Sequence, residues 1–422
     1  MSDDRKVMTL KLTIDTERLQ RELDELATYS DAPTPAVTRV LFTPTELRAR
    51  EYVRGLMTEA GLTVREDAVG NIFGRWEGLD PELPAVATGS HIDAIPFSGM
   101  YDGTVGVLGG IEAVRALKSA GFTPKRALEV IMFTAEEPTR FKIGCLGSRA
   151  LAGQLTPEKL TALTDADGFD FETVRRQAGY SGDLGDVELA VGHYASFIEL
   201  HIEQGPRLEA AGLPLGVVTA IAAPATIRVE IHGSGGHAGT VLMPDRRDVL
   251  PAAAELILSV EKIAKSSTSP DAVATVGLCN VYPGAVNSIP SKVYLEIDIR
   301  DIDLHSRNRI VDTTLQVVKA ICERRNLQFE AVVLNADNPC LSGQEVVEAA
   351  VESIRALGYP YQELVSRAYH DTLFMAEICP TCMIFVPSKN GYSHRPDEYT
   401  SPEENARGVE VLAHTLARLA NH

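Results

Sequence analysis

Short apolar runs alternate with helical patterns along the first half of the chain. The apolar run at 84–89 precedes a helical pattern at 104–121, and the run at 127–134 precedes another at 146–153. A further apolar run at 194–205 becomes polar where a strand would stop. Because strands that alternate with helices form sheets covered by helices, this half of the chain predicts an α/β domain.

The pattern changes from about residue 220. We predict, in order, a strand at 225–233, a helix at 249–265, strands at 272–281 and 292–303, a helix at 305–326 and a strand at 327–334. This β-α-β-β-α-β order is the split βαβ arrangement of ferredoxin-like domains. It predicts an inserted second domain of class α+β at residues 219–332.

The α/β pattern resumes after this insertion, with a helix at 344–358, a strand at 383–388 and a helix at 402–420. We therefore predict one discontinuous domain, residues 1–218 plus 333–422, interrupted by the second domain. A length of 422 residues agrees with two domains.

Composition and charge narrow the functional classes. The chain has 58 acidic and 40 basic residues, a net charge of −18, which argues against nucleic acid as a partner. It contains no apolar run of about 18 residues, the length of a membrane helix, and the N-terminal residues lack a secretory pattern. We expect a cytoplasmic protein that does not bind membranes. The pair Cys379 and Cys382 precedes an apolar strand, so we expect a structural role for it.

Residues that can bind metals recur at the predicted strand ends. They are His91, Asp93, Asp102, Glu136, Glu137, His201 and His394. Ligand sites in open α/β sheets lie at the carboxyl ends of the strands, so these side chains can converge. Each alone fits a structural role, but imidazoles and carboxylates together suit Zn, Mn, Co or Ni. Their joint occurrence predicts a site for two metal ions, with one aspartate as the bridge.

The motifs S-H-x-D, D-G, E-E, H-x-E-Q-G and S-H, in that order, resemble the M20 metallopeptidase superfamily. Within it, the chain is similar to the amidohydrolase branch of N-carbamoyl-L-amino-acid, allantoate and ureidoglycolate amidohydrolases. The resemblance extends from about residue 18 to residue 418. It implies that residues 1–218 plus 333–422 are a metal-binding catalytic domain, and that 219–332 is a lid and dimerisation domain.

The resemblance also implies a set of ligands for two divalent ions, with Mn expected and Zn, Co or Ni as alternatives. His91 and His201 would bind one ion, and Glu137 and His394 would bind the other. Asp102 would bridge both ions.

Three more residues acquire roles from the resemblance. Asp93 would orient His91. Glu136 would be the general base that takes a proton from water and delivers it to the leaving nitrogen. His237 would come from the partner subunit of a homodimer and stabilise the oxyanion.

Arg300 lies on the polar side of a predicted strand, a position typical of a solvent-facing arginine. In the family a matching arginine binds the substrate carboxylate, for which a guanidinium is suited by its bidentate geometry. Asn287 and Gln204 match other substrate contacts of the family.

The segment at 366–372, S-R-A-Y-H-D-T, resembles the ureidoglycolate amidohydrolases more than the other two groups. Tyr369 would narrow the pocket toward a small substrate, and His370 would contact a polar substituent. The expected reaction is hydrolysis of the ureido group of (S)-ureidoglycolate, a small anion, to glyoxylate, ammonia and CO2 in purine (allantoin) degradation. The alternatives are an N-carbamoyl-L-amino-acid hydrolase and an allantoate amidohydrolase.

Two readings from other classes remain. An aminoacylase or dipeptidase of the same superfamily would generally carry a carboxylate in place of His201. A non-catalytic scaffold would be expected to lose Glu136 or a ligand, and none is missing.

Overall fold

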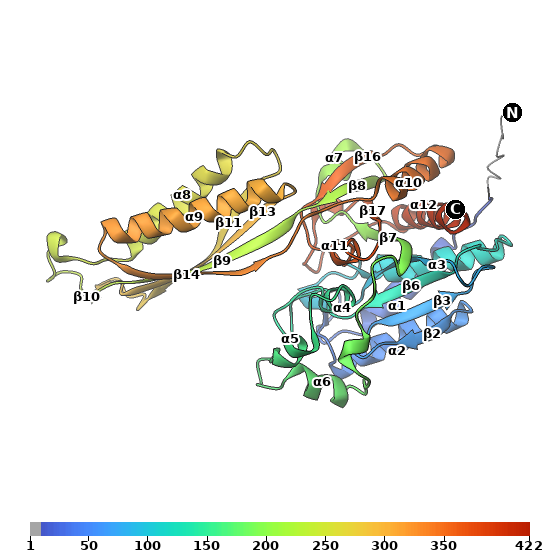
Figure 1. Ribbon diagram of the computed structural model, residues 1–422, viewed down its shortest axis with the longest axis horizontal. Helices are drawn as coiled ribbons and strands as arrows, with labels where there is room; N and C mark the ends of the chain where they lie inside the picture. The colour runs from blue at the N-terminus through green and yellow to red at the C-terminus, as the bar shows by residue number, and fades with distance from the viewer. Residues whose placement is uncertain (1–9) are drawn as a thin grey trace. The chain divides into compact units, whose positions relative to one another are not determined.

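A computed structural model describes residues 10–422, which divide into two compact units (Figure 1). The first unit runs to Thr219 and resumes at Ser342–His422, and the second is Ala220–Leu341. The second unit extends past residue 332 because strand β14 (Gln328–Ala336) belongs to its sheet, and the short β15 (Cys340–Leu341) follows at the boundary. Residues 1–9, on which the expectation of no secretory signal rests, lie outside the described residues.

A nine-stranded mixed sheet runs through the first unit, in the order β15-β8-β17-β7-β4-β6-β3-β2, with β16 beside β8. Strand β4 pairs in parallel with β6 and β7, whereas β3 and β8 pair antiparallel with their neighbours. The prediction of an α/β domain is confirmed, and its sheet is mixed. The strands are β2 (Thr63–Glu66), β3 (Ile72–Trp76), β4 (Ala85–His91), β6 (Leu128–Phe133), β7 (Tyr194–Ile202), β8 (Gly216–Ile221), β16 (Gln362–Ser366) and β17 (Thr381–Val386). Strands β1 (Val37–Arg39) and β5 (Ala94–Ser98) form a separate pair.

Helices cover both faces of this sheet, and each face has its own apolar core. Along β4, Val86 enters one core and Ala87 the other, because successive strand residues point to opposite faces. The first core contains α1 (Thr16–Thr28), α2 (Pro44–Glu59), α3 (Thr104–Ser119), α10 (Gln344–Leu357) and α12 (Pro402–Asn421). The second contains α4 (Leu146–Leu151), α5 (Pro157–Ala162), α6 (Phe171–Gln177) and α11 (Thr372–Met375), and α7 (Arg207–Ala211) follows β7. The central strands are therefore mostly apolar and buried on both faces, although Glu129 of β6 and Glu199 of β7 are charged residues buried within them.

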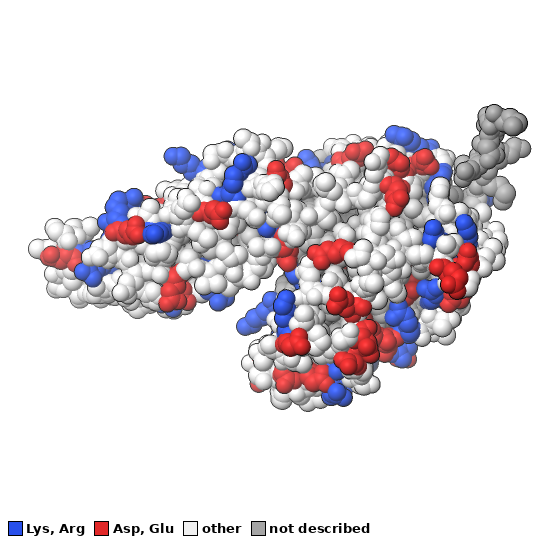
Figure 2. All heavy atoms as spheres, in the orientation of Figure 1, with Lys and Arg blue, Asp and Glu red and all other residues white. Residues whose placement is uncertain are grey.

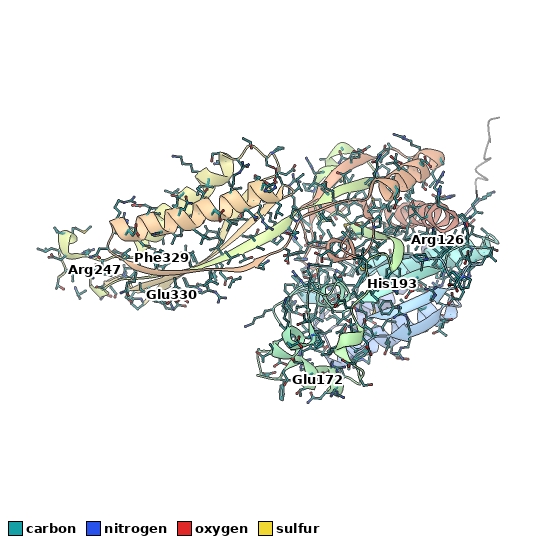
Figure 3. The ribbon with its side chains drawn as sticks, viewed as in Figure 1. Arg126, Glu172, His193, Arg247, Phe329 and Glu330 are labelled. Carbon is teal, nitrogen blue, oxygen red and sulfur yellow. The ribbon has the colours of Figure 1, made fainter. Side chains whose placement is uncertain are left out.

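The second unit has a four-stranded antiparallel sheet in the order β11-β13-β9-β14. Its elements are β9 (Ala223–His232), α8 (Leu250–Lys265), β11 (Val273–Tyr282), β13 (Lys292–Asp301), α9 (Leu304–Arg324) and β14, the predicted β-α-β-β-α-β order. Both helices lie on one face (Figure 1). The second unit has its own apolar core between its helices and its sheet. Phe329 of β14 packs against this core, whereas the neighbouring Glu330 is exposed (Figure 3). The short strands β10 (Gly236–His237) and β12 (Ser288–Ile289) pair with each other.

The surface agrees with the composition. On the face drawn in Figure 2, basic side chains are interspersed with acidic ones, so that face of residues 10–422 carries no extended basic patch. Within the same residues, every helix is too short or too polar to pass through a bilayer.

Candidate metal centre

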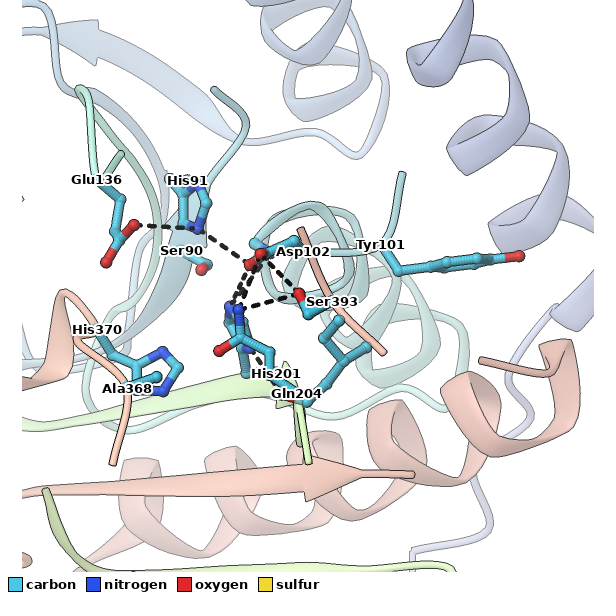
Figure 4. Close-up of polar contacts among 12 residues, drawn as sticks. Ser90, His91, Tyr101, Asp102, Glu136, His201, Gln204, Ala368, His370 and Ser393 are labelled. Atoms are coloured by element: carbon cyan, nitrogen blue, oxygen red, sulfur yellow. Dashed lines mark hydrogen bonds and ion pairs between the residues drawn. The ribbon is translucent and has the colours of Figure 1, made fainter. Parts of the chain in front are cut away.

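The polar residues predicted at the strand ends converge at one edge of the first unit's sheet (Figure 4). His91 is the last residue of β4, Glu136 and Glu137 follow β6, and His201 lies near the end of β7. These three strands are neighbours and run parallel, so their carboxyl ends meet. His394 reaches the same place from the segment between β17 and α12.

Asp102 lies at the centre of this cluster, and its two oxygens face different groups. Oδ1 is 3.6 Å from Nε2 of His91 and 3.2 Å from Nε2 of His201. Oδ2 is 3.1 Å from Nε2 of His394, and that nitrogen is 3.3 Å from Oε1 of Glu137. The geometry thus forms two three-residue groups that share one carboxylate.

Both groups fit a divalent cation. The ligand atoms of His91, Asp102 and His201 lie within 4.8 Å of one another, as do those of Asp102, Glu137 and His394. Nδ1 of His91 hydrogen-bonds the carbonyl of Asp93 at 3.1 Å, and Nδ1 of His201 that of Ile202 at 2.8 Å. Each Nδ1 thus faces a backbone carbonyl, so that Nε2 is the nitrogen directed at Asp102 and the one that could bind a metal.

A third group, Glu199 with His201 and His370, also has its ligand atoms within 4.8 Å. Glu199 already accepts hydrogen bonds from the hydroxyls of Ser90 at 2.7 Å and Thr372 at 2.5 Å. Since both oxygens of Glu199 are engaged, this group fits an ion less well than the other two.

The charges in the cluster are strongly coupled. Burial would raise the pKa of Asp102, but hydrogen bonds from His201, His394 and His91 outweigh it and hold that pKa well below its usual range. Hydrogen bonds to Asp102 and Glu137 raise the pKa of His394 to about 11. Burial, together with the charge of Glu137, raises the pKa of Glu136 well above its usual range. Asp102 is therefore an anion in this site, whereas Glu136 readily holds a proton.

Asp93 connects two parts of the centre. Its Oδ1 is 3.4 Å from Nδ1 of His91, and its carboxylate accepts the backbone N–H groups of Glu136 at 3.1 Å and Glu137 at 3.0 Å. Orientation of His91 was the role anticipated from sequence. The anchoring of the Glu136–Glu137 backbone emerges only from the structure.

Two further residues support Asp102, and one of them, Ser393, is the serine of the S-H motif. Glu398 accepts the backbone N–H groups of Tyr101 at 2.9 Å and Asp102 at 3.1 Å. The Ser393 hydroxyl lies 2.8 Å from Glu398 and 3.1 Å from Oδ2 of Asp102. No motif indicated Glu398, and neither residue was predicted to support Asp102, although both lie near His394 in the C-terminal segment.

Glycine is required immediately after Asp102. Gly103 has φ = 67°, and a Cβ there would lie 2.4 Å from Nε2 of His91. Any larger residue would be strained and would displace the imidazole. The D-G pair in the sequence is thus explained by close approach to His91.

Gln204 and His370 border the centre (Figure 4). Nε2 of Gln204 donates to Oδ2 of Asp102 at 2.8 Å, and its buried Oε1 has no hydrogen-bond partner among residues 10–422. The His370 ring is 4.6 Å from that of His201, and burial lowers the pKa of His370 well below its usual range. His370 is therefore neutral and Gln204 offers a free acceptor.

Tyr369 is half-buried beside His370. Its ring stacks on Phe374 with centroids 6.3 Å apart, and the Arg149 guanidinium lies 5.8 Å from the ring. These contacts hold the Tyr369 ring in a defined position.

The remaining predicted residues lie in the second unit. His237 and Asn287 are exposed, and they adjoin because the N–H of Ala238 donates to the carbonyl of Asn287 at 2.9 Å. Arg300 lies near the C-terminal end of β13, and its Nε is 2.9 Å from Oδ1 of Asp298. The buried side chains of Val293, Leu295, Ile297 and Ile299 confirm that Arg300 is on the polar face.

Comparisons with known proteins agree with this architecture. The ureidoglycolate hydrolase of Arabidopsis thaliana is 55% identical over 416 residues, which cover 97% of this chain and 87% of that protein. The N-carbamoyl-L-amino acid amidohydrolase of Geobacillus stearothermophilus is 41% identical over 408 residues, 96% of this chain and 99% of that protein.

A solved structure described as AtUAH in complex with (S)-hydroxyglycine matches with a TM-score of 0.88 and 55% identity, covering 97% of this chain and 98% of that one. The family model for peptidase family M20/M25/M40 matches residues 87–418. That range includes every residue of the metal centre described above. The chain therefore belongs to the peptidase family M20/M25/M40.

Proposed function

We propose that this protein is a metal-dependent amidohydrolase that hydrolyses the ureido group of (S)-ureidoglycolate, yielding glyoxylate, ammonia and CO2. The observation that carries the proposal is the paired donor set around Asp102, with the neutral His370 at its border (Figure 4). The 55% identity to a ureidoglycolate hydrolase across 97% of the chain supports this substrate.

His91 and His201 would hold one divalent ion, Glu137 and His394 a second, and Asp102 would bridge them, with Mn as the metal. Bound there, the two ions would supply Lewis-acid activation of water and of the ureido carbonyl. Asp93 keeps Nε2 of His91 directed at the centre, and the carbonyl of Ile202 does the same for His201.

Glu136 would be the general base. Its Oε2 is 3.8 Å from Nε2 of His91, so this oxygen faces the same centre (Figure 4). A carboxylate whose pKa is raised by burial can accept a proton from water at Oε2 and pass it to the departing nitrogen. Oε1 of Gln204 and the His370 ring would orient the polar groups of the substrate.

A comparison of substrates tests the proposal. Metal-free protein reloaded with Mn²⁺ is assayed for ammonia and glyoxylate release from ureidoglycolate, allantoate and an N-carbamoyl-L-amino acid. We expect the highest kcat/KM with ureidoglycolate, because Tyr369 would narrow the pocket toward a small substrate. A higher value with either larger substrate would reject ureidoglycolate as the substrate and leave the metal chemistry standing.

We also propose a homodimer in which the second unit acts as a lid and dimerisation domain. Lys292 and Arg300 are about 26 Å apart along β13, at about 3.3 Å per residue, and His237 lies beyond the Lys292 end. Arg300 and His237 of one copy therefore cannot contact the same small substrate. One of the two must come from a second copy if both act on it.

The edge of the second unit favours such an assembly. Strand β11 is at the edge of its sheet, and α8 packs beside it. Leu258 of α8 is 66% exposed and Val273 of β11 is 42% exposed. An apolar, unpaired edge of this kind fits a second copy of the chain.

Mixing two inactive variants checks the shared site. After subunit exchange, His237→Ala with Glu136→Ala should recover about one quarter of the wild-type activity, because half of the dimers carry one intact site. The control pair, Glu136→Ala with His201→Ala, should recover none, since both residues lie in the first unit. No recovery from the first mixture would reject the sharing of His237 between subunits.

Arg300 would bind the substrate carboxylate. We expect Arg300→Lys to raise KM about tenfold with a smaller change in kcat, because an ammonium cannot form the bidentate pair. Steady-state kinetics with ureidoglycolate provide the measurement. Arg228→Lys is the matched control, since Arg228 is on the same sheet face and pairs with Glu296. Equal KM values for both variants would remove Arg300 from the carboxylate site.

A further inference from the structure

The chain after β6 folds back so that Cys145 lies opposite Glu136. The backbone N–H of Cys145 donates to the carbonyl of Glu136 at 2.8 Å, and the N–H of Leu146 to that of Ala135 at 2.9 Å. The N–H of Gly147 donates to the carbonyl of Thr134 at 2.7 Å. Three consecutive bonds therefore fix the register between the start of α4 and the segment that carries Glu136.

The Cys145 side chain makes a second contact with the same residue. Its Sγ is 3.4 Å from Oε1 of Glu136, while Oε2 of Glu136 faces Nε2 of His91 at 3.8 Å. Cys145 is fully buried, and this burial raises the pKa of its thiol well above the usual range. The sulfur thus keeps its proton and donates it to Oε1. The two oxygens of Glu136 therefore have different surroundings. The thiol holds Oε1, and Oε2 is directed at the metal centre.

The local backbone is strained at the same place. Cys145 has φ = 54° and Ala135 has φ = 51°, in the left-handed region that non-glycine residues avoid. Such residues persist where the surrounding structure fixes them, and they cluster at functional sites. Ala135 precedes Glu136 in the chain and Cys145 faces it across the loop. The two strained residues therefore indicate that this loop is shaped to hold the Glu136 side chain.

We propose that Cys145 is a positioning residue for Glu136. The Cys145 thiol holds Oε1 of Glu136, so that Oε2 faces the reacting water. The inference rests on the proposed function, in which Glu136 is the general base. A thiol is a weak hydrogen-bond donor, so it fixes the orientation of the carboxylate with little cost to its basicity. The hydrogen bond from the Cys145 thiol and the backbone hydrogen bond from Cys145 to Glu136 together leave the Glu136 side chain one preferred orientation.

Kinetics of Cys145→Ala test the proposal, with Cys382→Ala as the matched control. Cys382 is also fully buried, but its thiol contacts the carbonyl of Val218 in the sheet. For Cys145→Ala we expect kcat to fall about 10- to 100-fold, as for a small misplacement of a catalytic group, with KM and metal content unchanged. Cys145→Ser should recover part of the loss, because the hydroxyl donates but its shorter bond places it farther from Oε1. Cys382→Ala should keep the wild-type kcat.

A second readout does not depend on turnover. The infrared difference spectrum of wild type minus Cys145→Ser isolates the S–H stretching band of the Cys145 thiol. The frequency of this band reports the strength of the hydrogen bond that the thiol donates. We expect Glu136→Gln to shift this band to higher frequency, because an amide oxygen accepts a weaker hydrogen bond than a carboxylate. A band that does not move would overturn the proposal, and this measurement still decides if Cys145→Ala fails to fold.

The two readouts separate this inference from the proposed function. If Glu136→Gln is inactive while Cys145→Ala keeps the wild-type kcat, positioning by Cys145 is wrong and the general base stands. If the wild type hydrolyses none of the ureido substrates, the proposed function fails, whereas the band shift still reports the contact between Cys145 and Glu136.

Discussion

Replacing Glu136 by Gln should lower kcat about 10²- to 10⁴-fold, the range that general acid–base groups contribute. KM and metal content should stay near their wild-type values. The physical reason is that the amide keeps the size of the side chain but cannot accept a proton, and Glu136 belongs to neither of the two three-residue groups around Asp102. Steady-state kinetics with the preferred ureido substrate, together with metal analysis of the purified variant, provide the measurement.

Glu112→Gln is the matched control for this variant. Glu112 is also fully buried, but it pairs with Arg18 at 2.7 Å, away from the metal centre. Its replacement should lower the free energy of unfolding and leave kcat close to wild type. A Glu136→Gln variant that keeps more than about one tenth of the wild-type kcat would exclude Glu136 as the general base, given the usual contribution of such a group.

The second large effect is expected from Asp102→Ala. The two oxygens of Asp102 face both donor groups, so its removal should release both ions rather than one. We expect metal content near zero after dialysis and a fall in kcat/KM of about 10³-fold or more, since both the activated water and the polarised carbonyl are lost. Metal analysis by mass spectrometry and initial rates at several Mn²⁺ concentrations measure these effects.

Asp93→Asn gives a graded comparison. Asp93 touches His91 and the backbone of Glu136 and Glu137, but it is not in either three-residue group. Loss of such a supporting carboxylate costs about 10- to 100-fold in metal affinity, and excess Mn²⁺ should restore most of the activity. Retention of both ions by Asp102→Ala would contradict its bridging role.

Much of the fold could be predicted from the sequence because its elements carry strong local patterns. The strand predicted at 292–303 corresponds to β13, in which Val293, Leu295, Ile297 and Ile299 alternate with more polar residues and all enter one core. The short strands β10 and β12 were not predicted. Two-residue strands have no periodicity to detect, and they form only because the chain brings His237 beside Ser288.

The candidate site shows the same division. The residues at the ends of β4, β6 and β7 could be grouped in advance, because parallel neighbouring strands end at one edge. The supporting contacts could not. Glu398 accepts a hydrogen bond from the backbone of Asp102, 296 residues earlier in the sequence. Cys145 contacts Glu136 across a loop whose left-handed residues are not indicated by any motif.

The sequence by itself determined which side chains are available for chemistry and which elements present them, since periodicity, turn residues and motif spacing are local properties of the chain. Only the tertiary structure decided how they are aimed. It directed the two oxygens of Asp102 to different groups, placed the Asp93 carboxylate between His91 and the Glu136–Glu137 backbone, and set the Cys145 thiol against Oε1 of Glu136. Orientation at this scale depends on packing and hydrogen bonds between distant segments, and these exist only when the chain has folded.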